Sequence, residues 1–481
     1  MDKLIKKNSL FNILYNIANL LFPLITSVYA SRIILAEGIG KVAYAQNIAS
    51  YFVTFSCLGL PTYGVREIAK VGEDKDKRNK LFTELILING MFTTIATICF
   101  VFLVFCIPRF RNDIVLFMCC GIQVLMNFFQ IDWLFRGIEK YKYITIRSIV
   151  VKGILLVSVL AFVRTKDDYV IYALCASLAV TLNYFFNVIQ ARKFVSFNFV
   201  KLELRKHFAP LVVLALSVFL SAAYSKVDIT MLGSMNSNVA TGLYSNAHKI
   251  IEIIITACTS ISAVFLPRLS YYYSHDRKAF KELIYMGMKI LAFITFPAAI
   301  GLFVMAPEIV ELFYGNSFYD AIVTIRIFTL LIVVKSFGDL LCYQLVIATG
   351  NERRRLPAYF LAAVLNIIIN ACLIPRMAQN GAAIASVISE LIVNSIQLYF
   401  MQKLLHLHYP VRDILQGVGS SLIMGGVVYF VCIAVIPWIY LRVALGLVIG
   451  IMTYILLNLA IKNEMAIKGL AIFKRRRGVG Q

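Results

Sequence analysis

Long polar stretches are missing from this sequence. No interval between its apolar runs exceeds roughly twenty residues, whereas a folded soluble domain needs upwards of about 50. Charged residues make up only 15% of the 481-residue chain, and hydrophobic residues make up 60%. Apolar runs of about 20 residues, the length that a helix needs to cross the hydrocarbon core, recur throughout. The sequence therefore predicts an all-α polytopic membrane protein whose function lies in its spans and short loops.

Motifs for enzymatic chemistry are also missing. The chain has no Walker A loop, no HExxH and no GxSxG, and its ten cysteines fall in apolar runs without metal-like spacing. His207 and Asp132 are loose candidates for a membrane-embedded glycosyl- or acyltransferase, but each lies at a span end without companion residues. We therefore expect no catalytic activity, no cofactor and no metal, and we interpret the cysteines as packing residues.

Acidic residues are outnumbered, with 25 Asp and Glu against 47 Lys and Arg, for a net charge of +22. If the N-terminus is cytoplasmic, most of the basic residues fall in or beside the cytoplasmic segments, and few fall in exterior loops. The excess charge thus indicates topology and contact with anionic lipid rather than nucleic acid. It predicts a multi-pass membrane protein with both termini in the cytoplasm.

Fourteen spans are predicted. The first is interpreted as a retained helix, because its apolar run is too long for a signal peptide and is followed by Arg32 rather than by a cleavage site. The spans lie near 8–34, 41–64, 81–107, 113–135, 143–163, 168–190, 207–233, 239–267, 283–305, 321–348, 357–375, 380–403, 413–437 and 440–461.

Two pairs of segments repeat with the same offset of six spans. GKVAYAQNI from Gly40 matches GLYSNAHKI from Gly242, and QIDWLFRGIEKYK (130–142) matches QLVIATGNERRR (344–355). An even offset gives both halves the same orientation, which predicts two parallel six-helix bundles related by an axis along the membrane normal. We place the first lobe at 1–206, the second at 207–405, and two additional helices with a basic tail at 406–481.

Amide side chains form a stripe along one face of the first span: Asn8, Asn12, Asn16 and Asn19. Unpaired amides facing lipid are costly, so the stripe is expected to face protein or a water-filled cavity. Hydrogen-bonding between helices and lining of a substrate cavity explain it equally well. Asn12 and Asn16 are therefore retained as cavity candidates.

Charged pairs occur in two other spans. Lys226 and Asp228 are two residues apart, so they point to different sides of a helix and each needs its own partner. Lys335 and Asp339 have the i, i+4 spacing of a helical ion pair, and a structural pair is the favoured interpretation.

Two further charges have no oppositely charged residue at helical spacing in the sequence. Arg326 precedes Lys335 on the same span and is a candidate cavity cation. Glu390 lies near the middle of the twelfth span, where a carboxylate is either hydrogen-bonded or a proton or cation site. Glu390 and Asp228 are the candidates for coupling transport to an ion gradient.

The stretch HKIIE, residues 248–252, places ionisable groups in the first half of the eighth span. Glu252 has helical spacing to both His248 and Lys249 and can partner either one. The stretch is either a packed polar knot or the cationic wall of a central cavity. The matching segment of the first half, QNIAS at 46–50, is uncharged. This asymmetry favours the interpretation that His248 and Lys249 face substrate.

Several stretches in their order along the chain resemble one family. They are SRIILAEGIGKVAYAQNIASYF, GLPTYGVREIA, QIDWLFRGIEKYKYITIR, VDITMLGSMNSNVATGLYSNAHKI, PAAIGLFVMAPEIVELFYG and NIIINACLIPRMAQNGAAIAS. Together they resemble the polysaccharide-transport branch of the multidrug/oligosaccharidyl-lipid/polysaccharide exporter superfamily, whose members include flippases for O-antigen and capsule repeat units.

The resemblance implies a V-shaped pair of six-helix lobes around a cationic cavity. It implies transfer of an undecaprenyl-diphosphate-linked oligosaccharide from the cytoplasmic to the exterior leaflet by alternating access. The implied partners are that glycan, membrane lipid, and the polymerase and chain-length proteins of surface polysaccharide assembly. The alternative within transporters is a cation-coupled exporter of small molecules, whose cavity should be acidic and aromatic rather than basic.

Overall fold

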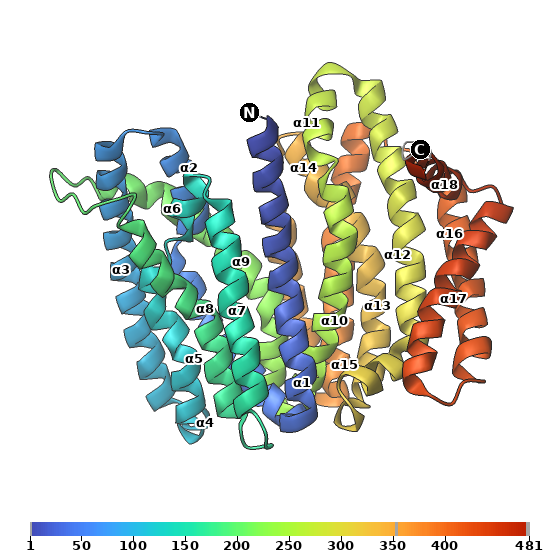
Figure 1. Ribbon diagram of the computed structural model, residues 1–481, viewed down its shortest axis with the longest axis horizontal. Coiled ribbons are helices and arrows are strands. Elements are labelled where there is room, and N and C mark those ends of the chain that lie inside the picture. The colour runs from blue at the N-terminus through green and yellow to red at the C-terminus, as the bar shows by residue number, and fades with distance from the viewer. Residues whose placement is uncertain (1, 352–354, 478–481) are drawn as a thin grey trace. The chain divides into compact units, whose positions relative to one another are not determined.

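The chain is almost entirely helical. The computed structural model describes residues 2–351 and 355–477, and no β-strand occurs among them. Helices satisfy every backbone hydrogen bond within one segment, which is the requirement that a hydrocarbon environment imposes on a spanning chain. Figure 1 shows that the axes of the long helices are roughly aligned within each half of the chain.

The chain divides into two compact units, residues 1–242 and 243–481. The helices of the first unit are α1 (Asp2–Cys57), α2 (Leu60–Val71), α3 (Lys75–Cys106), α4 (Pro108–Asn112), α5 (Ile114–Met126), η1 (Asn127–Phe129), α6 (Asp132–Gly137), α7 (Tyr141–Phe162), α8 (Tyr169–Ala191) and α9 (Arg205–Met235). The first residues of α10 (Asn238–Ala263) also belong to this unit.

The rest of α10 begins the second unit. The other helices of that unit are α11 (Leu266–His275), α12 (Arg277–Phe313), η2 (Asn316–Phe318), α13 (Ala321–Gly338), η3 (Asp339–Gln344), α14 (Leu345–Ala348), α15 (Arg355–Leu405), α16 (Val411–Val427), η5 (Val428–Ile433), α17 (Ile439–Ala460) and α18 (Glu464–Arg477). The lobe boundaries expected at 206 and 405, and the V-shaped arrangement, stay predictions.

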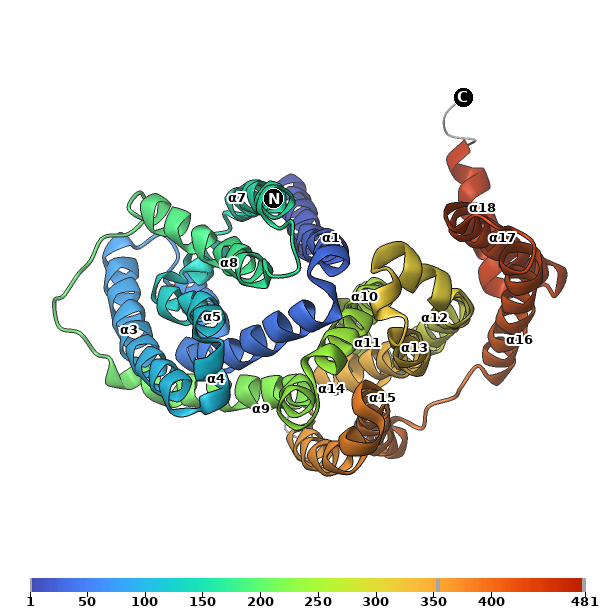
Figure 2. The ribbon, with the colours of Figure 1, turned by 90° about the horizontal axis from the view of Figure 1, so that it is seen from below.

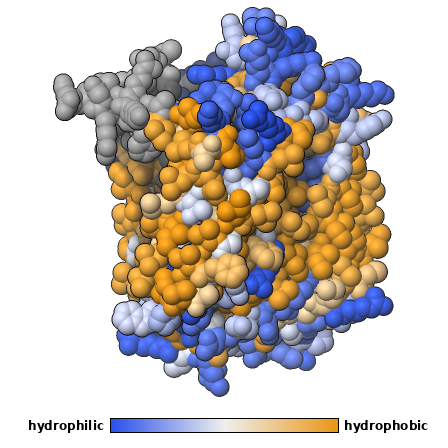
Figure 3. Space-filling model, turned by 90° about the vertical axis from the view of Figure 1, so that its right-hand side faces the viewer, coloured by the Kyte–Doolittle hydropathy of each residue, from blue (hydrophilic) through white to orange (hydrophobic). Residues whose placement is uncertain are grey.

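The polytopic fold with about fourteen crossings is confirmed. Ten helical stretches of the described residues are long and apolar enough to cross a membrane. Two of them contain a break in the helical backbone, at Leu35 in α1 and at Ala378 in α15, so each of these provides two crossings. The short apolar stretch Ile114–Phe129 and the 31-residue α9 complete the set. Figure 3 shows a wide apolar belt between two hydrophilic ends on the face that includes α16 and α17.

Glycine allows two segments of the first unit to cross at backbone contact. A Cβ atom on Gly40 of α1 would lie 1.6 Å from the carbonyl oxygen of Asn238, and one on Gly242 of α10 would lie 2.0 Å from that of Ala36. Each glycine thus meets the carbonyl four residues before the other glycine. The contact is symmetric, as expected for segments that the sequence repeat places in equivalent positions.

The second repeated pair has a similar local structure, but its register differs from the sequence match. The amide of Lys140 donates to Phe135 O at 2.8 Å, and the amide of Asn351 donates to Val346 O at 2.9 Å. Each bond closes a helix end just after a residue with positive φ, Glu139 at 57° or Gly350 at 69°. Glu139 is therefore the structural counterpart of Gly350, whereas the sequence match pairs Gly137 with it.

An ion-pair cluster joins the C-terminal helices to α12 within the second unit. Lys289 of α12 lies 3.5 Å from Asp413 of α16 and 2.7 Å from Glu464 of α18. Hydrogen bonds from Lys289 and then Lys468 lower the pKa of the Glu464 carboxyl to about 2. The three helices are thus held together at one end by ion pairs to one lysine.

The close crossing of α1 and α10 generates a stability prediction. Gly40→Val should lower the unfolding temperature and the yield of folded protein, because its side chain would push the Asn238 backbone away at a cost of at least about 1–3 kcal/mol. Gly153→Ala in α7 is the matched control, since no atom lies within 4 Å of its added Cβ. The measurement is thermal unfolding of the purified protein. Equal unfolding temperatures for the two variants would contradict the crossing.

Candidate functional site

A polar cavity of about 330 Å³ lies within the first unit. Residues of α1, α2, α6, α7 and α8 line it, and α7 packs against both α1 and α8. Its lining is rich in groups that form hydrogen bonds and carries three cations against one carboxylate. The lining residues are Tyr15, Asn19, Pro61, Gln130, Asp132, Trp133, Arg136, Arg147, Ser148, Lys152, Ala179, Val180, Asn183 and Tyr184.

The carboxylate of this cavity is paired with one of the cations. Arg147 Nη2 of α7 donates to Asp132 Oδ1 of α6 at 3.1 Å. The same guanidinium donates from Nε to Asn183 Oδ1 at 3.0 Å and from Nη1 to Asn187 Oδ1. Asn187 in turn donates to Asp132 Oδ1 at 2.6 Å. A buried ion pair needs such additional hydrogen bonds, because attraction between the charges alone does not offset their desolvation.

The other two cations have no carboxylate within ion-pair distance among the described residues. Arg136 lies over the ring of Tyr15, with 5.6 Å between the guanidinium carbon and the ring centroid. Lys152 Nζ donates to Asn19 Oδ1, a neutral acceptor. Lys152 also lies midway along α7, at the depth where an isolated charge is most costly. The cavity therefore has a net positive charge available to an anion.

The amide stripe of the first span meets this cavity at one of its members. Asn19 lines the cavity and is the partner of Lys152. The side chains of the two site candidates, Asn12 and Asn16, lie outside the described residues. Their assignment to the cavity stays a prediction.

The two charges of the seventh span have separate surroundings in α9, which packs against α1. Lys226 Nζ lies 5.9 Å from the ring centroid of Tyr51. Asp228 is buried, with 6% of its surface exposed. Asn47 of α1 donates to the Lys226 carbonyl at 3.0 Å and to Thr230 Oγ1 at 2.7 Å, which fixes α9 beside α1 at this level.

In α10, the histidine and the lysine of the HKIIE stretch have different partners. His248 Nδ1 lies 3.7 Å from Glu252 Oε2, and the histidine ring stacks on Tyr244 with 6.1 Å between centroids. Lys249 Nζ instead donates to Asn246 Oδ1 at 3.3 Å. Glu252 is therefore the partner of the histidine, and the lysine contacts a neutral amide.

The helical ion pair expected between Lys335 and Asp339 does not form. Lys335 Nζ of α13 lies 4.0 Å from Glu390 Oε2 of α15. Asp339 begins the π-helical turn η3 and accepts hydrogen bonds from Ser262 at 2.6 Å and Gln344 at 2.7 Å. The π turn changes the spacing on which the i, i+4 expectation depends, and it directs the carboxylate towards α10.

Arg326 lies in a different environment from the other candidates. It lines an apolar hollow of about 730 Å³ formed by α12, α13, α16 and η5. Its Nε donates to the carbonyl oxygen of Phe303 at 3.3 Å. Its guanidinium carbon lies 5.2 Å from the centroid of the Phe303 ring. The predicted residues therefore occur in several distinct places within the two units.

The three cations of the polar cavity were not among the residues predicted from the sequence. Arg147 and Lys152 lie near the start of the predicted fifth span, where the positive-inside pattern accounts for basic residues without any further role. The structure places both well inside α7, facing the cavity. Both residues lie within an otherwise apolar run, and basic residues in such runs rarely face lipid. Their position was therefore the sequence signal for a polar site inside the protein.

Two family models match the chain. The model described as polysaccharide biosynthesis protein matches residues 5–273, and the model described as lipid II flippase MurJ matches residues 146–458. Each covers more than half of the sequence.

Curated relatives and solved structures agree with these families. "Putative O-antigen transporter" of Escherichia coli K12 is 24% identical over 83% of this chain and 97% of its own length. "Probable low-salt glycan biosynthesis flippase Agl15" of Haloferax volcanii is 23% identical over 51% of this chain and 53% of its own. The inward closed structure of lipid II flippase MurJ covers 95% of this chain and 99% of its own, with a TM-score of 0.78 and 15% identity. The structure of an inward-facing multidrug resistance MATE family transporter aligns with 80% of this chain over 94% of its own length, with a TM-score of 0.64 and 14% identity.

The Asp132–Arg147 pair generates a prediction about stability. Arg147→Gln should destabilise the protein by about 3–5 kcal/mol, because it leaves a carboxylate without its counter-ion. Asp132→Asn combined with Arg147→Gln should restore much of this loss, because the buried charge is then absent. The measurement is the unfolding temperature of the single and double variants. A double variant less stable than Arg147→Gln alone would show that the pair is not the source of the effect.

Proposed function

Because the chain belongs to the polysaccharide biosynthesis protein family, we propose that it translocates an undecaprenyl-diphosphate-linked oligosaccharide repeat unit across the membrane. The lipid-linked glycan enters from the cytoplasmic leaflet and leaves to the exterior leaflet for assembly of O-antigen, capsule or exopolysaccharide. The observation that carries the proposal is the cationic, hydrogen-bonding cavity within the first unit.

The charge of the cavity suits a diphosphate. A diphosphate carries two or more negative charges and cannot cross hydrocarbon without a substitute for its hydration. Arg136 and Lys152 provide positive charge that no neighbouring carboxylate neutralises within the described part of the chain. Arg147 is held in place by Asp132 and two asparagines, so it contributes a fixed guanidinium at the cavity wall.

The neutral groups of the cavity suit a sugar. Asn19, Gln130 and Asn183 present amides, and Tyr15 and Tyr184 present rings with hydroxyl groups. Such groups donate to and accept from sugar hydroxyls without adding charge. The polyprenyl chain does not need a polar site, because it can remain in the bilayer while the headgroup passes through protein.

The proposed orientation follows from the charge pattern. Both termini are placed in the cytoplasm of a bacterial cell, and the chain crosses the cytoplasmic membrane as a multi-pass protein. The proposed partners are the lipid-linked glycan, membrane lipid, and the polymerase and chain-length proteins that act on the exported unit. No catalytic step is assigned to the chain.

The rival functions fit the cavity less well. The fold is shared with multidrug exporters, but an exporter of organic cations would need an acidic cavity, whereas this one is basic. For a transferase, His207 is buried between Glu84 and Tyr63, and Asp132 is paired with Arg147. Neither side chain is presented as a general acid or base to a bound substrate.

Ion coupling is part of the proposal, with Asp228 and Glu390 as the candidate groups. Glu390 lies next to Lys335 at 4.0 Å, a distance at which the two charges attract without a close hydrogen bond. Asp228 is buried in a spanning helix. His248 and Lys249 of α10 and Lys226 of α9 remain candidate contacts for the headgroup, as does Arg326 for an anion that reaches its apolar hollow.

Neutralising the cavity cations should weaken diphosphate binding. Lys152→Gln and Arg136→Gln should each raise the Kd of the purified protein for geranylgeranyl diphosphate about tenfold or more, because each removes one charged hydrogen-bond donor. Both variants should also lower the surface polysaccharide of the producing cell at equal protein level.

The control for this pair is Lys142→Gln, because Lys142 is an exposed lysine of the same α7 helix, outside the cavity lining. It should leave the Kd and the polysaccharide unchanged. If Lys142→Gln weakens binding as much as Lys152→Gln, the effect is one of net charge, and the cavity is not the binding site.

A second test concerns coupling. Asp228→Asn combined with Glu390→Gln should abolish export that depends on an ion gradient, while diphosphate binding persists, because the cavity cations are unchanged. The measurement is surface polysaccharide at equal protein level, with Glu37→Gln, an exposed glutamate paired with Lys41, as the control. Normal polysaccharide in the double variant would remove these two carboxylates from the mechanism.

A further inference from the structure

The segment between α8 and α9, residues 192–204, exposes large apolar side chains outside any helix. Phe197, Phe199 and Val200 are exposed over 60%, 65% and 67% of their surfaces. The rings of Phe197 and Phe199 are stacked, with 5.9 Å between centroids and an interplanar angle of 13°. Three neighbouring apolar residues exposed in this way are unfavourable in water and indicate a surface that contacts something apolar.

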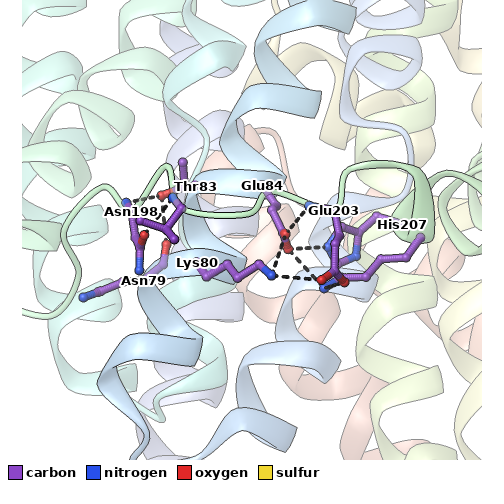
Figure 4. A network of polar contacts seen from close by, with 9 residues as sticks. Asn79, Lys80, Thr83, Glu84, Asn198, Glu203 and His207 are labelled. Carbon is purple, nitrogen blue, oxygen red and sulfur yellow. Dashed lines mark hydrogen bonds and ion pairs between the residues drawn. The ribbon is translucent and has the colours of Figure 1, made fainter.

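Side chains of α3 hold this segment in an extended conformation. Asn79 Oδ1 accepts from the amide of Ser196 at 2.9 Å, and Thr83 Oγ1 accepts from the amide of Asn198 at 2.8 Å. Figure 4 shows these contacts on one face of α3. Because alternate amides are bound to the helix, the conformation that exposes the two phenylalanines is a fixed feature of the fold.

A buried carboxylate fixes the other end of the segment. Glu84 Oε1 accepts from the amide of Glu203 at 2.7 Å, and Glu84 Oε2 lies 2.9 Å from His207 Nε2 at the start of α9. The other ring nitrogen of His207 lies 2.7 Å from the hydroxyl of Tyr63 in α2. Lys80 contacts Glu203 at the edge of this cluster, as Figure 4 shows, and Lys206 contacts the same carboxylate at 3.2 Å. Hydrogen bonds from the two lysines lower the pKa of the Glu203 carboxyl.

The segment lies on the outer side of the first unit. Figure 2 shows it running around the outside of α3, away from α1 and α7. In Figure 1 it lies at the same end as α2 and α6, the end that the positive-inside pattern predicts to be cytoplasmic. A surface at this position meets the edge of the cytoplasmic leaflet.

An apolar hollow of about 460 Å³ lies beside the exposed phenylalanines. It is enclosed by α3, η1, α8 and the segment itself. Its walls are aromatic and aliphatic, while Arg192 and Ser196 are its polar members. Arg192 is exposed at the end of α8, so its guanidinium can reach an anion outside the hollow. The lining residues are Phe82, Ile86, Phe128, Phe129, Ile131, Val188, Ala191, Arg192, Val195, Ser196 and Phe197.

Positive charge surrounds this apolar surface. Lys193 is exposed next to Arg192, and Lys201 and Arg205 are exposed at the far end of the segment. The combination of an apolar surface with a basic border is the one that binds an anionic leaflet, because lysines and arginines near the membrane surface are attracted to acidic headgroups.

We propose that the hollow holds an acyl chain of an anionic glycerophospholipid from the cytoplasmic leaflet, with its phosphate on Arg192. Phe197 and Phe199 enter the leaflet beside this lipid, and the basic border contacts neighbouring headgroups. The bound lipid would fix the level of the α8–α9 connection in the membrane. This site is separate from the polar cavity, and it involves a resident lipid rather than the transported one.

The apolar lining of the hollow favours a lipid chain over a peptide segment as its occupant. A peptide segment would need partners for its backbone amides, whereas the hollow is almost wholly apolar. A bilayer lipid needs only an apolar slot for its chain and a cation near the interface for its headgroup. Both are present within one short stretch of the chain, and their order matches the depth of acyl chain and phosphate in a leaflet.

The binding test uses the full-length protein in detergent and native mass spectrometry with added phosphatidylglycerol or phosphatidylcholine. Wild-type protein should retain more phosphatidylglycerol. Arg192→Gln should reduce this preference several-fold, and Ser196→Trp should displace the lipid by filling the hollow, while the Ser196 amide keeps its bond to Asn79. Arg111→Gln, at an exposed arginine of α4, is the matched control. Equal retention by wild type, Arg192→Gln and Ser196→Trp would overturn the proposal.

A second measurement reports the depth of the segment directly. The fluorescence of Phe199→Trp in proteoliposomes should be quenched by brominated acyl chains and little by aqueous iodide, after subtraction of the two native tryptophans. Phe162→Trp, at an exposed phenylalanine at the end of α7, provides the reference for a residue of a spanning helix. Quenching by iodide alone would show that the segment faces water, and protection from both quenchers would show that a protein partner covers it. Either result would overturn the proposal. Neither measurement uses transport, so their outcome is independent of the proposed translocation.

Discussion

The cost of placing a charge in hydrocarbon is the constraint on which the arrangement of this molecule depends. It explains why Arg147 is surrounded by Asp132, Asn183 and Asn187 rather than by aliphatic side chains. The same constraint explains the contact of Lys335 with Glu390 across two helices. In each case the partner comes from another helix, so the charges also fix how helices pack. Arg136 and Lys152, which have no such carboxylate within ion-pair distance among the described residues, line the polar cavity.

Within the polar cavity, this constraint distinguishes the cation that is paired with a carboxylate from the cations that are not. Each of the three guanidinium nitrogens of Arg147 donates a hydrogen bond to protein, and these bonds fix its position in the cavity wall. Lys152 has one neutral acceptor, Asn19, which orients the ammonium without cancelling its charge. An anionic headgroup can therefore gain the full attraction of Lys152, and it loses no existing ion pair when it binds. A cavity in which a carboxylate was already paired with every cation would not offer this gain.

The sequence could predict features that depend on local periodicity and average charge. The span boundaries, the all-helical fold and the equivalence of Gly40 with Gly242 all follow from such patterns, and the structure shows the two glycines in symmetric contact. Partners from distant helices could not be predicted, as the neighbours of Arg147 illustrate. The expected Lys335–Asp339 pair was wrong because a π-helical turn begins at Asp339, and no simple spacing rule anticipates that turn. The untested assignments of Asn12 and Asn16 stay predictions.

A basic residue near the predicted cytoplasmic end of a span can have at least three roles, and only its surroundings distinguish them. Lys142 is exposed at the start of α7 and needs no explanation beyond topology. Lys152 lies ten residues further along the same helix and faces a polar cavity, where its charge is available to a substrate. Arg192 lies at the rim of an apolar hollow beside exposed phenylalanines, a combination that suits a lipid headgroup. The positive-inside pattern is therefore a sum over residues with different roles. In a flippase whose cargo and surrounding lipids are both anionic, these roles must occupy separate surfaces, because a resident phospholipid in the transport cavity would compete with the cargo for the same cations.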